Sequence, residues 1–102
     1  MGLGTDELRH LTGASVPDGI NVTMATADSR RVRPGGLFAA LKGVRSDGHD
    51  FARQAAAKGA TAILGGRKGV SIFEGVPYIY SADPRRNFAM IAHRLAGDPT
   101  RA

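Results

Sequence analysis

Two short polar segments of the sequence carry side chains suited to binding a small ligand. The first is Asp28–Ser29–Arg30, and the second runs from Gly43 to Gly48. A hydroxyl that follows a strand can hydrogen-bond a phosphate or the edge of a base at short range. The apolar run Leu37–Leu41 lies between the two segments and has the length of a central strand. Loops at strand ends hold ligands in α/β domains, so this stretch predicts a binding site.

Ser29 is the leading candidate for a direct ligand contact. Ala27 is small and apolar, so a flat ring could lie against it. Arg30 has two interpretations: its charge attracts a diphosphate, or it pairs with Asp28 or Asp47 and holds the two loops together. The neighbouring arginines at 31 and 33 are better explained as a solvated turn, and the one at 45 adds charge to the second loop.

The sequence predicts no catalytic residue and no metal site. The three histidines, His10, His49 and His93, form no pair at the i, i+4 spacing of a helical metal site. His49 is predicted to cap a helix or to lie in its first turn. No nucleophile-elbow pattern surrounds a serine.

An ATP-phosphate loop is also missing from the sequence. The Walker pattern, G-x-x-x-x-G-K-[ST], does not occur. The Gly-rich, basic segment 65–69 has a different spacing and is predicted to be a connecting turn.

Composition limits the class of protein. The 102 residues are enough for one domain with one modest core, and 42% of them are hydrophobic. No cysteine is present, which excludes disulfides and thiolate metal sites and is compatible with the cytosol. No signal core or apolar run of membrane-spanning length occurs, so a cytoplasmic location is expected. The net charge of +5 suggests an anionic partner.

The order of predicted elements indicates a small single-domain α/β fold with a mixed or mainly parallel sheet flanked by helices. Expected helices begin at Thr5, Asp47 and Asp83, with Thr5 and Asp83 as N-caps. Expected strands span 21–27, 37–41, 61–64 and 77–81, and segment 71–74 is ambiguous. A helix is expected from 47 to 58, capped by Asp47 or His49. Its helical repeat is marked by Phe51, Gln54, Ala55 and Lys58. The last helix is expected to bury the stripe Phe88, Ile91, Ala92 and Leu95.

A longer pattern carries a family resemblance. Residues 28–51 read DSRRVRPGGLFAALKGVRSDGHDF. This segment resembles the amino-terminal domain of the Mur ligases, ATP-dependent amide ligases of peptidoglycan assembly, whose pattern there is roughly DSR-x-V-x-PG-x-LF-x-A-L-x-G-x-x-x-DGHDF. The similarity covers about residues 20–102, and residues 1–19 match weakly.

The resemblance implies which residues contact the substrate. In the tripeptide-forming Mur ligases this domain holds the UDP part of UDP-N-acetylmuramoyl-L-alanyl-D-glutamate. Position by position, the contacts fall on Ala27, Ser29, Val44, Arg45 and Ser46. Supporting positions in the same two loops are Asp28, Arg30, Gly43, Asp47 and Gly48.

The resemblance also implies a place in a longer enzyme. ATP, Mg²⁺ and catalysis would belong to the central and C-terminal domains, so this chain is expected to be a substrate-binding domain that is inactive alone. The diaminopimelate- or lysine-adding members fit better than the D-Ala-D-Ala-adding members. Two rival functions stay open: a basic nucleic-acid-binding module, although no recognition motif or aromatic platform is present, and a protein-interaction module without a ligand.

Overall fold

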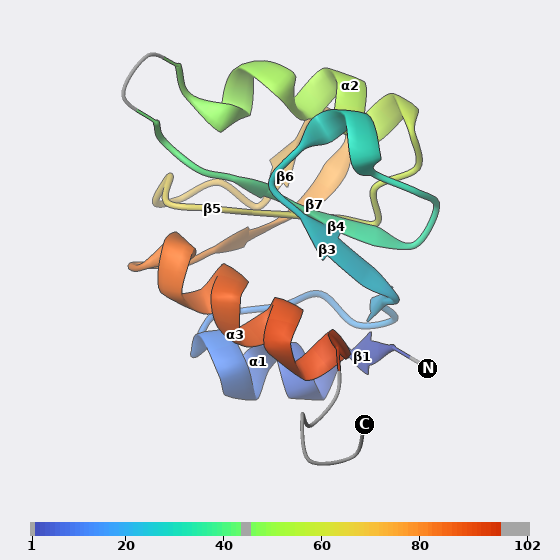
Figure 1. The fold of residues 1–102 in the computed structure, drawn as a ribbon. Coiled ribbons are helices and arrows are strands. Elements are labelled where there is room, and N and C mark those ends of the chain that lie inside the picture. Colours follow the sequence, from blue (N-terminus) through green and yellow to red (C-terminus); the bar gives the residue numbers. More distant parts are fainter. Residues whose placement is uncertain (1, 44–45, 97–102) are drawn as a thin grey trace.

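A five-stranded sheet forms the centre of the molecule, as the computed structural model shows for residues 2–43 and 46–96 (Figure 1). The strand order is β3-β4-β5-β7-β6. The first four of these strands are parallel and β6 runs antiparallel to β7. Their bounds are β3 Met24–Thr26, β4 Gly36–Ala40, β5 Ala62–Gly65, β6 Ile72–Phe73 and β7 Val76–Tyr80. The expected fold class, α/β with a mixed and mostly parallel sheet, is confirmed.

Helices cover both faces of the sheet (Figure 1). One face carries α2 (Ala52–Ala57) with two short 3-10 turns, η1 (Ser29–Arg31) and η2 (Gly48–Phe51). The other face carries α1 (Thr5–Thr12) and α3 (Pro84–Ala96). A small antiparallel pair, β1 (Leu3–Gly4) and β2 (Asn21–Val22), lies beside α1.

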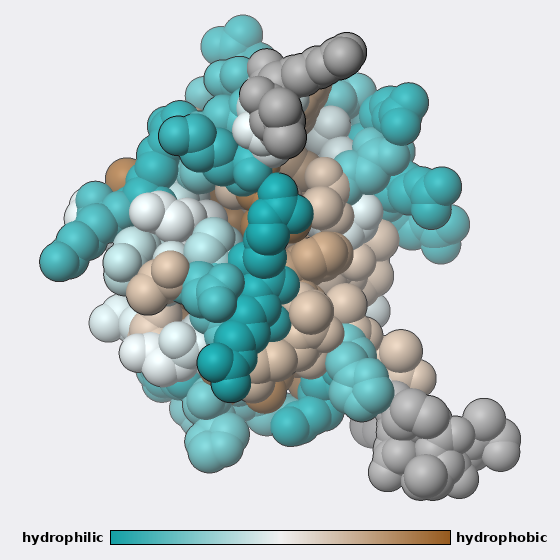
Figure 2. All heavy atoms as spheres, turned by 60° about the vertical axis from the view of Figure 1, so that its left-hand side comes forward, coloured by the Kyte–Doolittle hydropathy of each residue, from teal (hydrophilic) through white to brown (hydrophobic). Residues whose placement is uncertain are grey.

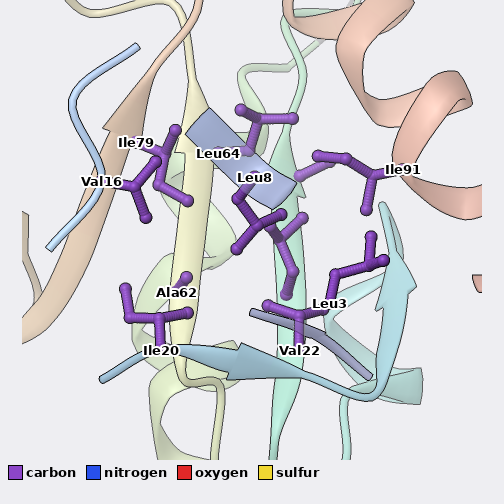
Figure 3. Close-up of a cluster of buried hydrophobic side chains, with 11 residues drawn as sticks. Leu3, Leu8, Val16, Ile20, Val22, Ala62, Leu64, Ile79 and Ile91 are labelled. Carbon is purple, nitrogen blue, oxygen red and sulfur yellow. The ribbon is translucent and has the colours of Figure 1, made fainter. Parts of the chain in front are cut away.

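Each face has its own apolar cluster, because successive side chains of a strand point to opposite sides. In β4, Leu37 and Ala39 face α1 and α3, whereas Phe38 and Ala40 face α2. All four side chains are buried, as expected for a central strand covered on both sides. The cluster beneath α1 and α3 is drawn in Figure 3, and its labelled members are Leu3, Leu8, Val16, Ile20, Val22, Ala62, Leu64, Ile79 and Ile91.

The strand predicted over residues 21–27 is divided in two. β2 pairs antiparallel with β1, whereas β3 pairs parallel with β4. Thr23 separates them, and its backbone N–H donates a hydrogen bond to the Gly35 carbonyl at 3.0 Å. One run of strand-forming residues therefore serves two sheets.

The predicted N-cap at Thr5 is wrong. The N-cap is Gly4, and Thr5 is the first residue of α1. The Thr5 hydroxyl instead donates to the Pro17 carbonyl at 2.7 Å and accepts from the Ile20 N–H at 3.0 Å. The side chain therefore fastens the 17–20 turn to the helix.

The helix predicted from Asp47 begins as η2 and continues as α2. Asp47 is confirmed as its N-cap, since its carboxylate accepts the His49 N–H. Of the predicted repeat only Ala55 is buried, because Phe51 is 46% exposed and Gln54 and Lys58 are exposed. Ala52 is buried beside Ala55, and these small side chains let the helix approach the sheet closely.

The last helix follows its prediction. Asp83 caps α3 by accepting the Arg86 N–H at 3.3 Å. Ile91 is fully buried, and Phe88 and Leu95 pack against the same cluster. The amphipathic stripe therefore attaches α3 to the sheet.

Candidate functional site

The parallel strands bring both polar loops to one edge of the sheet. Each loop follows the carboxyl end of a strand, the first after β3 and the second after β4, and these strands are neighbours. Their carboxyl ends lie toward the left of Figure 1. Figure 2 turns this side forward and shows hydrophilic residues bordering a strip of apolar surface. This edge is where open α/β sheets bind ligands.

Asp28 organises the first loop through short-range contacts. Its carboxylate accepts the backbone N–H of Arg30 at 3.0 Å and two guanidinium N–H groups of the same residue, both at 3.0 Å. These hydrogen bonds lower the pKa of Asp28 from 3.8 to about 2. Of the interpretations offered for Arg30, pairing with Asp28 is confirmed and pairing with Asp47 is not observed.

Ser29 lies at the base of this loop and is buried. Its hydroxyl donates a hydrogen bond to Oε1 of Gln54 at 2.7 Å. The hydroxyl proton is therefore already used inside the domain, and the oxygen offers a ligand its lone pairs.

A hollow of about 390 Å³ opens next to Ser29. Its lining comes from both the first loop and α2: Ala27, Asp28, Ser29, Arg30, Phe51 and Gln54. The loop residues were predicted as site residues, whereas Phe51 and Gln54 were read only as helix positions. Their spacing of three is the signal that was available, because it places both side chains on one side of a helix.

The second loop is closed by backbone hydrogen bonds. Gly43 N–H donates to the Ser46 carbonyl, and Gly48 N–H donates to the Leu41 carbonyl, both at 2.8 Å. A Cβ at Gly48 would lie within 3 Å of the Leu41 backbone, so the residue must be glycine for this closure. Ser46 is exposed, and the two other predicted contacts, at positions 44 and 45, lie outside the described residues.

A chain of hydrogen bonds extends from the second loop into the sheet. Arg67 N–H donates to the Tyr78 hydroxyl at 2.9 Å, and that hydroxyl lies 2.7 Å from Nε2 of His49. Nδ1 of His49 lies 2.6 Å from Asp47 Oδ1. Because the ionised Asp47 carboxylate can only accept, Nδ1 of His49 carries a proton and donates to it. In the neutral ring, Nε2 then accepts the Tyr78 hydroxyl proton.

This chain is buried at its centre and charged at its end. His49 and Tyr78 are buried, and burial raises the pKa of the Tyr78 hydroxyl. The backbone N–H of His49, assisted by its ring and by the Arg67 guanidinium, lowers the pKa of Asp47 to about 2. Arg67 also lies 3.3 Å from Asp47 and 5.2 Å from the centre of the Phe73 ring.

The sequence reasoning missed this arrangement. His49 was predicted as a cap or first-turn residue, and the segment carrying Arg67 as a plain turn. A second hollow of about 320 Å³ lies beside the arrangement, lined by Ala40, Lys42, Asp47, His49, Gly66, Arg67 and Pro84. The two loops thus share an edge of the sheet but border separate hollows.

The Gly-rich segment 65–69 does not form an open phosphate loop at Gly65. The space next to the Gly65 backbone, in the Gly-rich segment, is filled by the Tyr78 hydroxyl and the His49 ring rather than open to a phosphate. Within ranges 2–43 and 46–96, no three acidic or histidine side chains gather as metal ligands do. None of the helices described there is long and apolar enough to cross a membrane.

The fold and the two loops agree with a known family. The sequence profile described as "Mur ligase family, catalytic domain" matches residues 21–96. The chain belongs to the Mur ligase family. The match contains both polar loops and every strand from β3 to β7.

Curated Mur ligases support this assignment with sequence identities above 40%. The chain is 54% identical over 75 residues to UDP-N-acetylmuramoyl-L-alanyl-D-glutamate–2,6-diaminopimelate ligase of Caulobacter vibrioides, covering 71% of this chain and 15% of that protein. It is 42% identical over 98 residues to the ligase of the same name from Streptomyces coelicolor, covering 93% and 19%. This Mur ligase chain thus spans less than one fifth of the length of these relatives.

A solved structure supports the fold. MurF from Acinetobacter baumannii superposes with a TM-score of 0.71 at 24% identity, covering 85% of this chain and 19% of that one. At this identity the likeness concerns the architecture alone. The curated relatives named above are diaminopimelate ligases, in agreement with the expected subgroup.

Proposed function

We propose that this domain binds the uridine diphosphate end of UDP-N-acetylmuramoyl-L-alanyl-D-glutamate within a peptidoglycan ligase that adds diaminopimelate. The observation that carries the proposal is that the described residues of both polar loops follow the carboxyl ends of adjacent parallel strands, with an open hollow beside Ser29. Edges of this kind hold nucleotides in open α/β sheets.

The role of the domain would be positioning. Binding energy from the nucleotide end orients the distant peptide carboxylate, which lowers the entropic part of the barrier to amide formation. ATP and Mg²⁺ would act elsewhere in the full-length ligase, where ATP activates that carboxylate. The missing Walker pattern supports this assignment, as does the lack of a metal-ligand cluster within the described residues. The domain by itself would bind substrate without turning it over.

The names of the curated relatives support diaminopimelate as the added amino acid. We propose residues 1–102 as the amino-terminal substrate-binding domain of such a ligase. The D-Ala-D-Ala-adding alternative has weaker support, since the A. baumannii MurF likeness is at 24% identity.

A nuclear magnetic resonance titration tests this function. UDP-N-acetylmuramoyl-L-alanyl-D-glutamate is added to the ¹⁵N-labelled chain, and shifts are expected at amides 27–30 and 43–48. Shifts confined to another face, or none at millimolar ligand, would contradict the proposal. A nucleic-acid oligomer serves as the control, and binding of it with steep salt dependence would favour the rival function instead.

A further inference from the structure

The sheet has an open edge at β3. This strand is the first in the sheet order, and its neighbour is β4 (Figure 1). The Gly36 carbonyl of β4 accepts an N–H from the segment that enters β5. Because the backbone groups of consecutive strand residues alternate in direction, Leu37 faces β3 and is flanked there by Met24 and Thr26. The N–H and carbonyl of Ala25, which lies between these two residues, therefore point away from the sheet.

Nothing in the described part of the chain takes up these outward groups. Among residues 2–43 and 46–96, neither the N–H nor the carbonyl of Ala25 is hydrogen-bonded to a group on the outer side of β3. Ala25 is only half-buried. Unpaired N–H and C=O groups on an exposed strand edge are a template for one more strand.

A groove of about 630 Å³ lies beside this edge. Its lining consists of Met24 from β3 and residues 30–33 from η1 and the segment that returns to the start of β4. Three guanidinium groups are thus combined with the apolar side chains of Met24 and Val32. The groove is distinct from the hollow beside Ser29, with which it shares Arg30.

The groove carries an excess of positive charge. Asp28 lies 3.0 Å from Arg30 and 3.8 Å from Arg31, and it is the carboxylate that these arginines share. The Arg31 side chain is 79% exposed. Arg33 is also exposed and forms no ion pair with a carboxylate of the described ranges. Three guanidinium groups therefore face one carboxylate, and guanidinium pairs preferentially with carboxylates in bidentate geometry.

We propose that the β3 edge binds an extended, acidic peptide segment of a partner protein, which adds a further strand to the sheet. The Ala25 N–H donates to the backbone of the partner, and the Ala25 carbonyl accepts from it. Acidic side chains at every second position of the partner lie on one face of its strand and reach Arg31 and Arg33. This surface is separate from the hollow of the proposed function and does not depend on it.

A peptide suits this edge better than a nucleic acid does. A polypeptide supplies the alternating N–H and C=O groups that complete a strand edge. Nucleic acids that bind in basic grooves stack their bases on aromatic side chains, and no aromatic residue lines this groove. A phosphate backbone would use the arginines but leave the Ala25 amide unpaired.

The test uses the full chain and a labelled peptide of alternating glutamate and threonine, about ten residues long, which is the upper length of ordinary strands. At saturation, hydrogen exchange of the Ala25 amide is expected to slow about 10-fold or more, because a hydrogen bond now protects it. The amides of Met24 and Thr26 already face β4 and should not change. A peptide with lysine in place of glutamate, and one with every backbone nitrogen methylated, are the controls.

A pair of matched variants tests the charges. Arg31→Gln/Arg33→Gln is expected to weaken the acidic peptide about 10-fold, the sum of two exposed ion pairs. Lys68→Gln/Arg86→Gln removes the same charge at exposed residues outside the groove, so its effect should stay below about 2-fold at physiological salt. Fluorescence anisotropy measures the affinities, after far-UV circular dichroism confirms that each variant is folded.

Four results would overturn the proposal. The first is absence of acidic-peptide binding to the unmodified chain at millimolar concentration, and the second is equal weakening by the two double variants. The third is an unprotected Ala25 amide or undiminished affinity of the methylated peptide, either of which excludes strand addition. The fourth is tighter binding of an oligothymidylate of equal charge, which would assign the groove to nucleic acid. Failure of UDP to bind would leave this inference intact.

Discussion

The two polar loops lie at the same edge of the sheet but are held in place by different means. In the first loop Asp28 holds Arg30, two positions away, and a single side-chain hydrogen bond joins Ser29 to Gln54, 25 positions away. The second loop is held from a distance: His49 meets Tyr78 across 29 positions, and Arg67 meets Asp47 across 20. The first loop is therefore anchored to α2 through Ser29 and shaped at Asp28 and Arg30 by its own sequence, whereas the second loop is fastened to a strand of the sheet through Tyr78.

This difference in anchoring affects how rigid each loop is when a ligand binds. A loop shaped by local hydrogen bonds can adjust to a ligand without disturbing the core. A loop fastened to buried groups is rigid, and its geometry is set before a ligand arrives. We expect the second loop to couple to the stability of the whole domain and the first loop not to do so.

The largest effect is expected for Gly65→Ala. The added Cβ would overlap the Tyr78 hydroxyl and lie 2.7 Å from Nε2 of His49, which breaks the hydrogen-bond chain behind the second loop. Overpacking of this kind costs about 1–3 kcal/mol of the free energy of unfolding. Urea unfolding followed by circular dichroism measures it.

The adjacent glycine is the control for this experiment. A Cβ at Gly66 would meet nothing closer than 3.5 Å, so Gly66→Ala is expected to change the free energy of unfolding by less than about 0.5 kcal/mol. Equal losses of unfolding free energy in the two variants would show that the hydrogen bonds linking Tyr78, His49 and Asp47 do not contribute specifically to stability.

The second-largest loss of unfolding free energy is expected for Tyr78→Phe. The substitution keeps the ring but leaves the Arg67 N–H and His49 Nε2 without their partner. A buried polar group left unpaired costs about 1–3 kcal/mol, so a loss in this range is predicted for the unfolding free energy. Tyr80→Phe is the matched control and should be near neutral, since the Tyr80 hydroxyl makes no hydrogen bond within the described residues. A neutral Tyr78→Phe would contradict the proposed rigidity.

Acid should distinguish the two loops spectroscopically. The pKa values of Asp28 and Asp47 are both lowered from 3.8 to about 2, so the folded state binds these protons more weakly than the unfolded state. Their contribution to stability is complete above about pH 4 and is lost as pH falls toward 2. Amide spectra recorded from pH 7 to pH 2 follow this loss.

The pattern of shifts in that titration tests the comparison. Protonation of Asp28 should move the Arg30 amide and its close neighbours only. Protonation of Asp47 should also move the Tyr78 and Arg67 amides, because the hydrogen-bond chain connects them. Asp47→Asn should abolish the distant shifts. Distant shifts that persist in this variant would contradict the assignment.

The smallest effect is expected for Arg30→Gln. This arginine is 79% exposed, and exposed ion pairs contribute little to stability. The urea midpoint should stay within error of that of the unmodified chain. Arg67→Gln, the same substitution at the second loop, should lower the midpoint measurably because it removes an ion pair and a cation–π contact. Equal midpoints would remove the distinction between the loops.

Much of the fold was predictable because it depends on local patterns. The run 37–41 is apolar throughout and is a strand buried on both faces. Asp47 and Asp83 have the positions of N-caps, and both side chains accept the expected backbone N–H groups. Three predictions departed from the structure: the cap at Thr5, the single strand over 21–27 and most of the repeat of α2. Tertiary contacts outweighed the local pattern at these places.

The candidate site was predictable only in its first loop. Asp28, Ser29 and Arg30 are adjacent in the sequence, so their proximity needed no knowledge of the fold. Phe51 and Gln54 join them because α2 packs beside η1. Nothing in the spacing of residues 29 and 54 reveals that contact, since it depends on how closely the alanines of α2 approach the sheet.

The sequence by itself determined the parallel α/β architecture, the two polar loops and the absence of a Walker pattern, because these follow from short-range periodicity and residue types. Only the tertiary structure decided that Ser29 donates its proton to Gln54 and that His49 connects Asp47 to Tyr78. The physical reason is that hydrogen bonds form between groups within about 3 Å of each other, whatever their separation along the chain. The strand order β4-β5-β7 brings Tyr78 near His49, and the packing of η1 against α2 brings Ser29 to Gln54; no local pattern encodes either contact.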